Sequence, residues 1–308
     1  MTDKQNRVAI LLSTFNGERF LPAQLDSLLA QTHTACDIWL RDDGSSDGTL
    51  AIVHRYAEQY PSIRLKEGAN LGFVGSFHDL LQTAGDGYDF YFYCDQDDIW
   101  QADKVAHAVR ALAGQSGVAL YCSRTQYVDE QLQALGQSPD FPPHLIAWGN
   151  ALVQNIATGC TMALNAPARQ ILLSAPPRFC LAHDWWAYLV VSAFGQVVFD
   201  PQSHILYRQH ASNTIGMLQP GWSGQWARVQ RFVRRLRKVG PGWLDQLSEL
   251  DRVHGARLQP EQREQLQMLV HSREGFIAAL RAAYKSFYWR MSPVDTLILR
   301  VLLALRLY

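Results

Sequence analysis

Long apolar runs are missing from this 308-residue sequence, and so is an excess of charge of either sign. No stretch reaches the roughly 20 apolar residues that a membrane-spanning helix needs, so we expect no transmembrane helix. The 28 basic side chains balance 28 acidic ones, which argues against a general nucleic-acid-binding protein. With 48% hydrophobic and 18% charged residues, the chain is also not composed like a disordered protein. We therefore expect one large folded domain or two modest ones.

Cysteine is scarce as well, and the number and spacing of the cysteines argue against a metal site and against a disulfide framework. The five cysteines are odd in number and form no close metal-ligand pairs: Cys36, Cys94, Cys122, Cys160 and Cys180. This usage fits a reducing compartment better than a disulfide framework. The polar N-terminal residues lead straight into a strand-like run, so we expect no signal peptide. Together these features predict a cytoplasmic protein.

The first half of the sequence alternates strand-like and helix-like segments. Apolar runs predict strands at 8–12, 38–40, 63–66, 90–94 and 118–122, and helical spacing predicts helices at 20–30, 49–60, 73–83 and 104–113. Two further strands are predicted at 194–199 and 205–207. This alternation is typical of an α/β fold with βαβ units and a mostly parallel sheet. Ligands bind such sheets beyond the carboxyl ends of the strands, where polar clusters occur at 13–16, 42–43 and 95–98.

The character of the chain changes near residues 216–222. Residues 222–239 contain six basic and no acidic residues, with apolar residues at helical spacing. This pattern predicts a cationic amphipathic helix, most simply one that contacts an anionic membrane surface. The alternatives are a helix that packs on the catalytic domain with a solvated basic face and, least favoured, a nucleic-acid-binding patch. The remaining sequence is helical in pattern, and its last apolar run packs as a core helix, mediates oligomerisation or lies at an interface. We predict a catalytic domain over 1–218 and a helical region over 219–308.

The acidic cluster Asp95-Gln96-Asp97-Asp98 directly follows a hydrophobic strand. Carboxylates at such a position can converge on a hard divalent cation that also binds substrate phosphates. Taken alone, the cluster is equally consistent with a solvated acidic turn. The second acidic segment, 42–48, is also typical of a turn and a helix N-cap, so Ser46 or Asp47 can cap the helix while Asp43 faces a ligand.

In order along the chain, these segments resemble the motifs of the family 2 glycosyltransferases. The resemblance covers roughly residues 7–215 and rests on seven segments: Ser13-Thr-Phe-Asn-Gly17, Asp42-Asp-Gly-Ser-Ser-Asp-Gly-Thr49, Asn70-Leu-Gly-Phe73, Asp95-Gln-Asp-Asp-Ile-Trp100, Thr158-Gly-Cys-Thr-Met-Ala163, His183-Asp-Trp-Trp186 and Tyr207-Arg-Gln-His210. It implies the GT-A fold, Rossmann-like with a mostly parallel sheet flanked by helices, followed here by a mainly helical C-terminal extension. The versions of the motifs are most similar to those of bacterial rhamnosyltransferases.

The resemblance also implies a role for each motif residue. Asp184 would be the general base that takes the acceptor's proton in an inverting displacement. Asp95, Asp97 and His210 would hold Mg²⁺ or Mn²⁺. The nucleotide-sugar would be bound by Thr14, Asn16, Glu18, Asp43, Asn70, Gly72, Asp95 and Arg208, with Asp43 hydrogen-bonding a uracil or thymine base.

The function implied is metal-dependent, inverting transfer of a single sugar to a bacterial surface glycan. L-rhamnose from dTDP-L-rhamnose is the donor we expect, and lipopolysaccharide core or O-antigen the acceptor, an oligosaccharide or glycolipid. The alternatives are a UDP-hexose or UDP-N-acetylhexosamine donor and, outside the enzymes, an inactive nucleotide-sugar-binding module. We expect peripheral contact with the cytoplasmic face of the inner membrane, oligomerisation through the C-terminal helices as an option, and no nucleic-acid partner.

Overall fold

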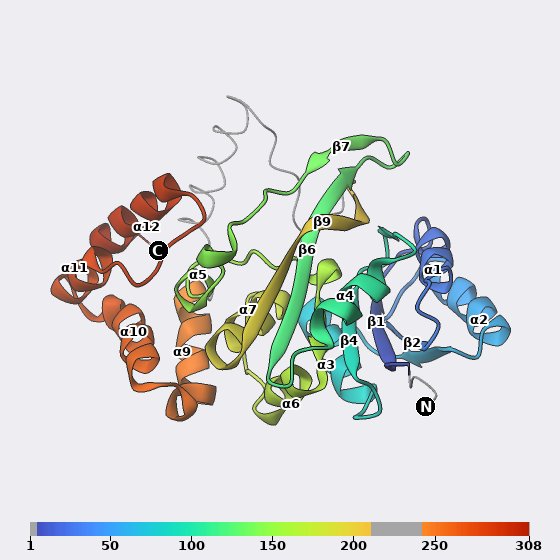
Figure 1. Cartoon of the computed structure of the whole chain (residues 1–308), viewed down its shortest axis with the longest axis horizontal. Coiled ribbons are helices and arrows are strands. Elements are labelled where there is room, and N and C mark those ends of the chain that lie inside the picture. Colours follow the sequence, from blue (N-terminus) through green and yellow to red (C-terminus); the bar gives the residue numbers. More distant parts are fainter. Residues whose placement is uncertain (1–4, 211–241, 308) are drawn as a thin grey trace.

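The computed structural model describes residues 5–210 and 242–307. The predicted domain boundary at 218/219 and the basic segment 222–239 lie outside these described residues. Among the described residues, no helix is long and apolar enough to cross a membrane. The described part forms an α/β body joined to a cluster of C-terminal helices (Figure 1).

One nine-stranded sheet runs through the α/β body, in the order β3-β2-β1-β4-β8-β6-β9-β5, with β7 paired to β6. Strands β3, β2, β1 and β4 are parallel, which confirms the predicted mostly parallel sheet at this end. The strands are β1 (Val8–Thr14), β2 (Cys36–Asp42), β3 (Ile63–Glu67), β4 (Phe90–Cys94), β5 (Ile99–Trp100), β6 (Ala119–Val128), β7 (Ala134–Gln137), β8 (Ala163–Asn165) and β9 (Gln196–Arg208). Their carboxyl ends bring the polar loops to one edge.

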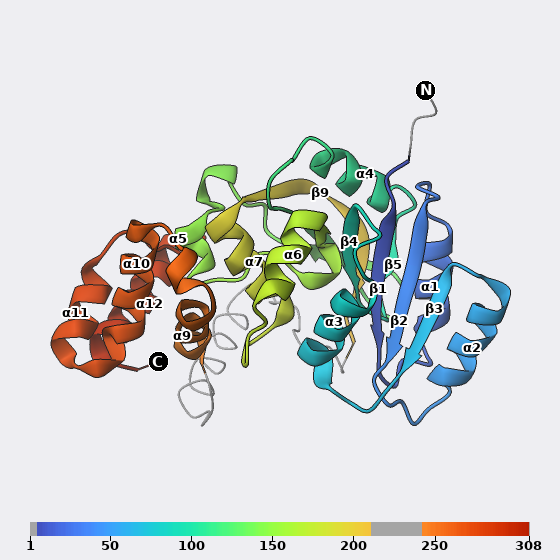
Figure 2. The same cartoon turned by 90° about the horizontal axis from the view of Figure 1, so that it is seen from below.

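Helices cover both faces of the sheet because alternate residues of the buried strands point to opposite sides. Val8, Ile10 and Leu12 pack with α1, α2 and α4, whereas Ala9 and Leu11 pack with α3, α6 and α7. Figure 2 shows α3 and α1 on opposite sides of β1. The helices of this body are α1 (Leu21–Leu29), α2 (Thr49–Gln59), α3 (Gly72–Thr83), α4 (Lys104–Leu112), α5 (Trp148–Ala151), α6 (Ala166–Ser174) and α7 (His183–Phe194).

The two strands predicted at 194–199 and 205–207 were wrong as separate elements. Phe194 ends helix α7, and a single strand, β9, runs from Gln196 to Arg208. It pairs in parallel with β6, which is itself longer than predicted, and the register shifts between Ser123 and Arg124. This irregularity lets the strand continue past Pro201, which cannot donate to a sheet ladder. The apparent break in the sequence is therefore a bulge.

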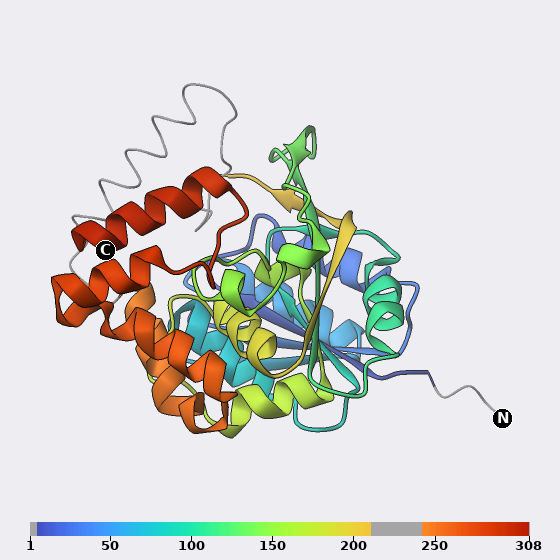
Figure 3. The same cartoon turned by 60° about the vertical axis from the view of Figure 1, so that its left-hand side comes forward.

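The C-terminal region is helical, as predicted. It consists of α9 (Trp243–His254), α10 (Pro260–Val270), α11 (Phe276–Tyr284) and α12 (Pro293–Leu305) (Figure 3). Its apolar side chains join the same core cluster as α3, α6 and α7. Asn150 on α5 donates to the carbonyl of Trp289 (3.1 Å) and accepts from the hydroxyl of Tyr188 (2.9 Å), which ties this region to α7.

Gly149 provides a test of this junction. A Cβ placed at Gly149 would overlap the carbonyl oxygen of Phe287 and the ring of Trp289. We expect Gly149→Ala to lower the free energy of unfolding by about 1–3 kcal/mol, the usual cost of overpacking. Gly114→Ala is the matched control, because nothing lies within 4 Å of a Cβ there. Urea denaturation of both variants measures the difference, and equal stabilities would contradict this packing.

Candidate functional site

The loop after β1 is fastened to the loop after β2 by two buried side chains. Thr14 is 1% exposed, and its hydroxyl donates to Asp42 Oδ2 (3.0 Å). Asp42 Oδ1 in turn accepts from the backbone nitrogens of Gly44 (3.1 Å) and Ser45 (2.8 Å). Thr14, predicted to line a nucleoside pocket, is therefore committed to holding the turn that carries Asp43.

Asn16 and Glu18 continue the same junction on the surface. Asn16 has a φ of 49°, in the left-handed region that asparagine tolerates better than most residues. Its side-chain oxygen accepts from the backbone nitrogen of Ser46 (2.8 Å), and Glu18 accepts from that of Gly48 (2.6 Å). Both residues are exposed, so they lie at the rim where the first two loops meet.

Asp43 joins the second loop to the third. Its carboxylate is buried, forms an ion pair with Arg41, and accepts from the backbone nitrogen of Leu71 (2.9 Å). Beside it, Asn70 accepts from the nitrogen of Gly72 (2.9 Å), which begins α3 with a φ of 69°. The predicted residues Asp43, Asn70 and Gly72 are thus brought together. Both of these contacts use Asp43 Oδ1, so Arg41 and the turn orient the carboxylate through one oxygen.

Gln96, which the sequence reasoning did not single out, locks the acidic loop to the first loop. Its side-chain amide accepts from the nitrogen of Phe15 (2.8 Å) and donates to the carbonyl of Phe15 (3.0 Å). A Cβ at Gly17 would collide with the Gln96 amide, so any larger residue there would displace Gln96 from Phe15. The only available signal was the position of Gln96 between two candidate ligands.

The end of β9 meets the acidic loop from the opposite side. His210 Nε2 lies 2.7 Å from Asp97 Oδ2, so two of the predicted metal ligands are adjacent. The guanidinium of Arg208 donates to the carbonyls of Asp97 (2.9 Å) and Glu130 (2.7 Å), and lies over the ring of Phe20. Arg208, predicted to bind the donor, is positioned by these contacts and fixes the backbone that carries Asp97.

Asp98 supports the loop from beneath. It is fully buried and accepts from the backbone nitrogen of Arg208 (3.1 Å). Burial, followed by the charges of Asp97 and Asp95, raises the pKa of Asp98 well above its ordinary value. The Asp98 side chain therefore stabilises the acidic loop from within, through its bond to the backbone of Arg208.

Asp184 and Asp95 share one electrostatic environment, although 89 positions separate them in the sequence. Asp184, at the start of α7, is 7% exposed and accepts from the nitrogens of Gly159 (3.1 Å) and Trp185 (2.6 Å). Burial raises the pKa of Asp184 to about 6. Burial, then the charges of Asp97 and Asp184, raise the pKa of Asp95 to about 7. A divalent cation would relieve this repulsion, so the oxygen-rich donor set fits one.

An aromatic cluster sets the position of Asp184. The ring of His183 stacks on Phe77 at 4.0 Å and meets Tyr93 edge-on at 4.8 Å. Burial lowers the pKa of His183 to about 3, so the imidazole is neutral at ordinary pH. Trp186 is 4% exposed, and Trp185 donates to the carbonyl of Ala151 (2.9 Å). The side chains around Asp184 thus anchor the first turn of α7.

Comparison with known proteins places this site in a family context. Residues 9–172 match the family model "Glycosyl transferase family 2". The chain is 27% identical over 224 residues to the dTDP-rhamnosyl transferase RfbG of Shigella flexneri, covering 67% of this chain and 73% of that protein. It is 25% identical over 259 residues to an uncharacterised protein of Mycobacterium tuberculosis, covering 81% of this chain and 70% of that protein.

Solved glycosyltransferase structures share the fold. S. aureus TarS 1–349, in complex with UDP-GlcNAc, superimposes with a TM-score of 0.55 at 15% identity and covers 96% of this chain and 86% of its own. GalNAc-T7 with UDP, GalNAc and Mn²⁺ gives a TM-score of 0.58 at 12% identity, covering 86% of this chain and 56% of its own. These likenesses confirm the predicted GT-A fold. With more than half of its residues matched by the family model, the chain is a glycosyltransferase and belongs to glycosyl transferase family 2.

Proposed function

We propose that this enzyme transfers a single sugar, with inversion, from a nucleotide-sugar to a bacterial surface glycan in a metal-dependent reaction. The observation that carries the proposal is the contact of Asp97 with His210 (2.7 Å) in the same loop as Asp95, whose pKa is raised by burial and then by the charges of Asp97 and Asp184. Asp95 and Asp97 would bind a cation that neutralises the leaving diphosphate, and the buried Asp184 would accept the acceptor's proton. These are the two functions that an inverting transfer requires. An inactive binding module would need no such carboxylate.

Asp95, Asp97 and His210 are the residues we assign to Mg²⁺ or Mn²⁺. Asp97 and His210 are already 2.7 Å apart, and a neutral imidazole and a carboxylate are both competent ligands. GalNAc-T7, which shares the fold, was solved with Mn²⁺. When bound, the metal would neutralise the departing diphosphate.

Asp184 is our assignment for the general base. Inversion requires that the acceptor hydroxyl lose its proton while the diphosphate leaves from the opposite face, and a carboxylate with a raised pKa is a stronger base than a solvated one. The backbone nitrogens of Gly159 and Trp185 hold the carboxylate of Asp184 in place. The sugar-like transition state would carry oxocarbenium character.

The donor pocket would lie over the first three loops. We assign recognition of the nucleotide's uracil or thymine ring to Asp43 Oδ2, because Oδ1 makes both contacts that fix the side chain. The rest of the pocket would be formed by Asn16, Glu18, Asn70, Gly72, Asp95 and Arg208, with Thr14 supporting it from beneath through its bond to Asp42. RfbG supports dTDP-L-rhamnose as the donor. TarS, crystallised with UDP-GlcNAc, supports the alternative of a UDP-hexose or UDP-N-acetylhexosamine.

The acceptor we propose is lipopolysaccharide core or O-antigen, an oligosaccharide or glycolipid at the cytoplasmic face of the inner membrane. Membrane contact through residues 222–239 and oligomerisation through the C-terminal helices remain predictions.

Asp97→Asn tests the metal assignment. Loss of an anionic ligand should abolish turnover while the thermal unfolding temperature stays near that of the wild type. Asp140→Asn, at an exposed position outside the site, is the matched control and should retain activity. Wild-type turnover that survives excess EDTA would rule out the metal.

Asp184→Asn tests the assignment of Asp184 as the general base. We expect kcat to fall by about 10²–10⁴-fold, with donor affinity nearly unchanged. In the wild type, a base with a pKa of about 6 must be deprotonated, so kcat should fall as the pH drops below 6 and level off above it. A variant that keeps kcat but loses donor affinity would make Asp184 a binding residue.

A panel of nucleotides tests the donor. Because Asp43 suits a ring N–H, dTDP and UDP should raise the melting temperature more than GDP or CDP when Mg²⁺ or Mn²⁺ is present. We expect dTDP to give the larger shift of the two. A clear preference for GDP would overturn the role of Asp43 together with the rhamnose donor.

A further inference from the structure

Helices α11 and α12 present large apolar side chains to solvent. Ile277 is 68% exposed, Tyr284 91% and Leu297 63%. Other exposed apolar residues on these two helices are Phe276, Leu280, Val294, Ile298, Val301 and Leu305. Ile277, Leu280, Tyr284, Leu297 and Val301 line one common groove. Single exposed apolar residues are ordinary, but a contiguous group of this size marks a binding surface.

This apolar surface is a property of folded helices, not of a frayed end. The opposite faces of α11 and α12 are packed, with Ala279, Ala282 and Leu303 at 0% exposure. Ser292 accepts from the backbone nitrogen of Asp295 and so caps the start of α12. Each helix therefore has one apolar face in the core and a second apolar face outside it.

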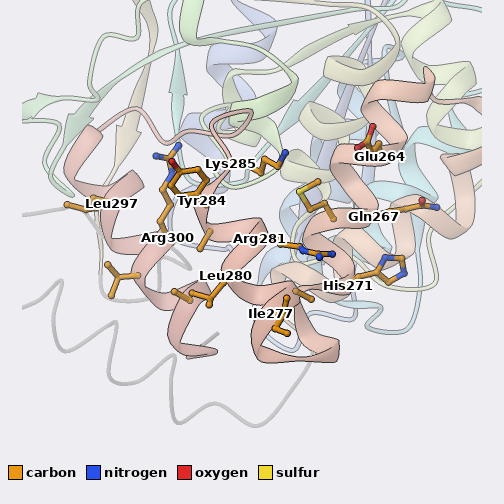
Figure 4. Close-up of a pocket in the computed structure, with 15 residues that line it drawn as sticks. Glu264, Gln267, His271, Ile277, Leu280, Arg281, Tyr284, Lys285, Leu297 and Arg300 are labelled. Atoms are coloured by element: carbon orange, nitrogen blue, oxygen red, sulfur yellow. The ribbon is translucent and has the colours of Figure 1, made fainter.

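A groove runs over the exposed side. Its volume is about 1330 Å³, and Met268, Ile277, Leu280, Leu297 and Val301 are among the residues that line it. Figure 4 shows these helices side by side, with Arg281, Lys285 and Arg300 on the same surface. The groove thus combines apolar walls with three basic side chains and one acidic side chain, Glu264. In Figure 1, α11 and α12 lie at the left end of the molecule and β1 and β4 lie right of centre.

Charge decides between the possible occupants. Residues 276–307 contain five basic residues and one acidic residue, Asp295. A second copy docked face to face would oppose two surfaces of the same sign, which is unfavourable. An anionic lipid surface offers opposite charge to the basic residues and hydrocarbon to the apolar ones.

We propose that α11 and α12 form a membrane-docking face that lies in the headgroup region of an anionic bilayer. With 9 and 13 residues the two helices are too short to span, so they would lie along the surface. The inference does not depend on the identity of the donor or on residues 222–239. It would bring the enzyme to an amphiphilic acceptor.

Flotation with vesicles tests the docking face on the full chain. The apolar variant carries Ile277→Ser, Tyr284→Ser, Leu297→Ser and Val301→Ser. The matched control carries Leu132→Ser and Leu135→Ser, two exposed apolar residues near β7. We expect the wild type and the control to float with phosphatidylglycerol-containing vesicles, and the apolar variant to bind at least tenfold less.

A second variant, Arg281→Gln with Lys285→Gln, keeps the apolar face and removes two charges. Each basic residue near an anionic surface contributes roughly 1 kcal/mol, so binding should fall about 30-fold and should weaken with salt. Equal flotation of the wild type and both variants would overturn the proposal. So would a wild-type dimer, measured by sedimentation, that dissociates in the apolar variant while vesicle binding is absent.

Sugar transfer to a short soluble acceptor, without vesicles, separates this inference from the proposed activity. The apolar variant should retain that transfer within about twofold, because its substitutions lie outside the site. Loss of flotation with intact transfer would support the docking face. Intact flotation in a chain without transferase activity would leave the docking face standing and refute the proposed reaction.

Discussion

Repulsion among three clustered carboxylates is the constraint on which the rest of the site depends. Asp95 and Asp97 share the loop after β4, whereas Asp184 begins α7, and the negative charges of Asp97 and Asp184 both disfavour ionisation of Asp95. Bringing them together costs free energy unless a proton or a cation intervenes. The fold meets this cost with neighbours that hold the backbone rigidly: Gln96 against Phe15, Arg208 against the carbonyl of Asp97, and Gly159 against Asp184. Packing and hydrogen bonds elsewhere thus stabilise a locally unfavourable arrangement.

The alternation of segments in the first half of the sequence predicted the sheet well, because buried parallel strands are short apolar runs flanked by loop residues. It failed at β9, where Pro201 and polar residues interrupt the pattern of one continuous strand. The register shift that accommodates them depends on the partner strand β6, and no local sequence pattern reports it.

The sequence likewise predicted one part of the candidate site and missed another. The motifs identified Asp97 and His210, and the structure brings both together. They could not reveal that Thr14, Asn16 and Glu18 bond to the neighbouring loop, because those contacts join β1 to β2 across about 30 positions. Gln96 and Glu130 were missed for a related reason: the Gln96 amide bonds to the backbone of Phe15, and Glu130 accepts from Arg208 through its own backbone carbonyl, so neither contact has a pairwise side-chain signature.

The pairing of Gln96 with Phe15 has a consequence for how this enzyme can diverge. Gln96 reads the peptide group of residue 15 and not its side chain, which is 47% exposed. A substitution at Phe15 would therefore leave both hydrogen bonds to Gln96 in place while changing the side chain that the loop exposes. Gly17, two residues on, has no such freedom, since any side chain there would displace the Gln96 amide. One short loop thus holds a position whose side chain makes no hydrogen bond to Gln96 and another where a side chain would disturb Gln96.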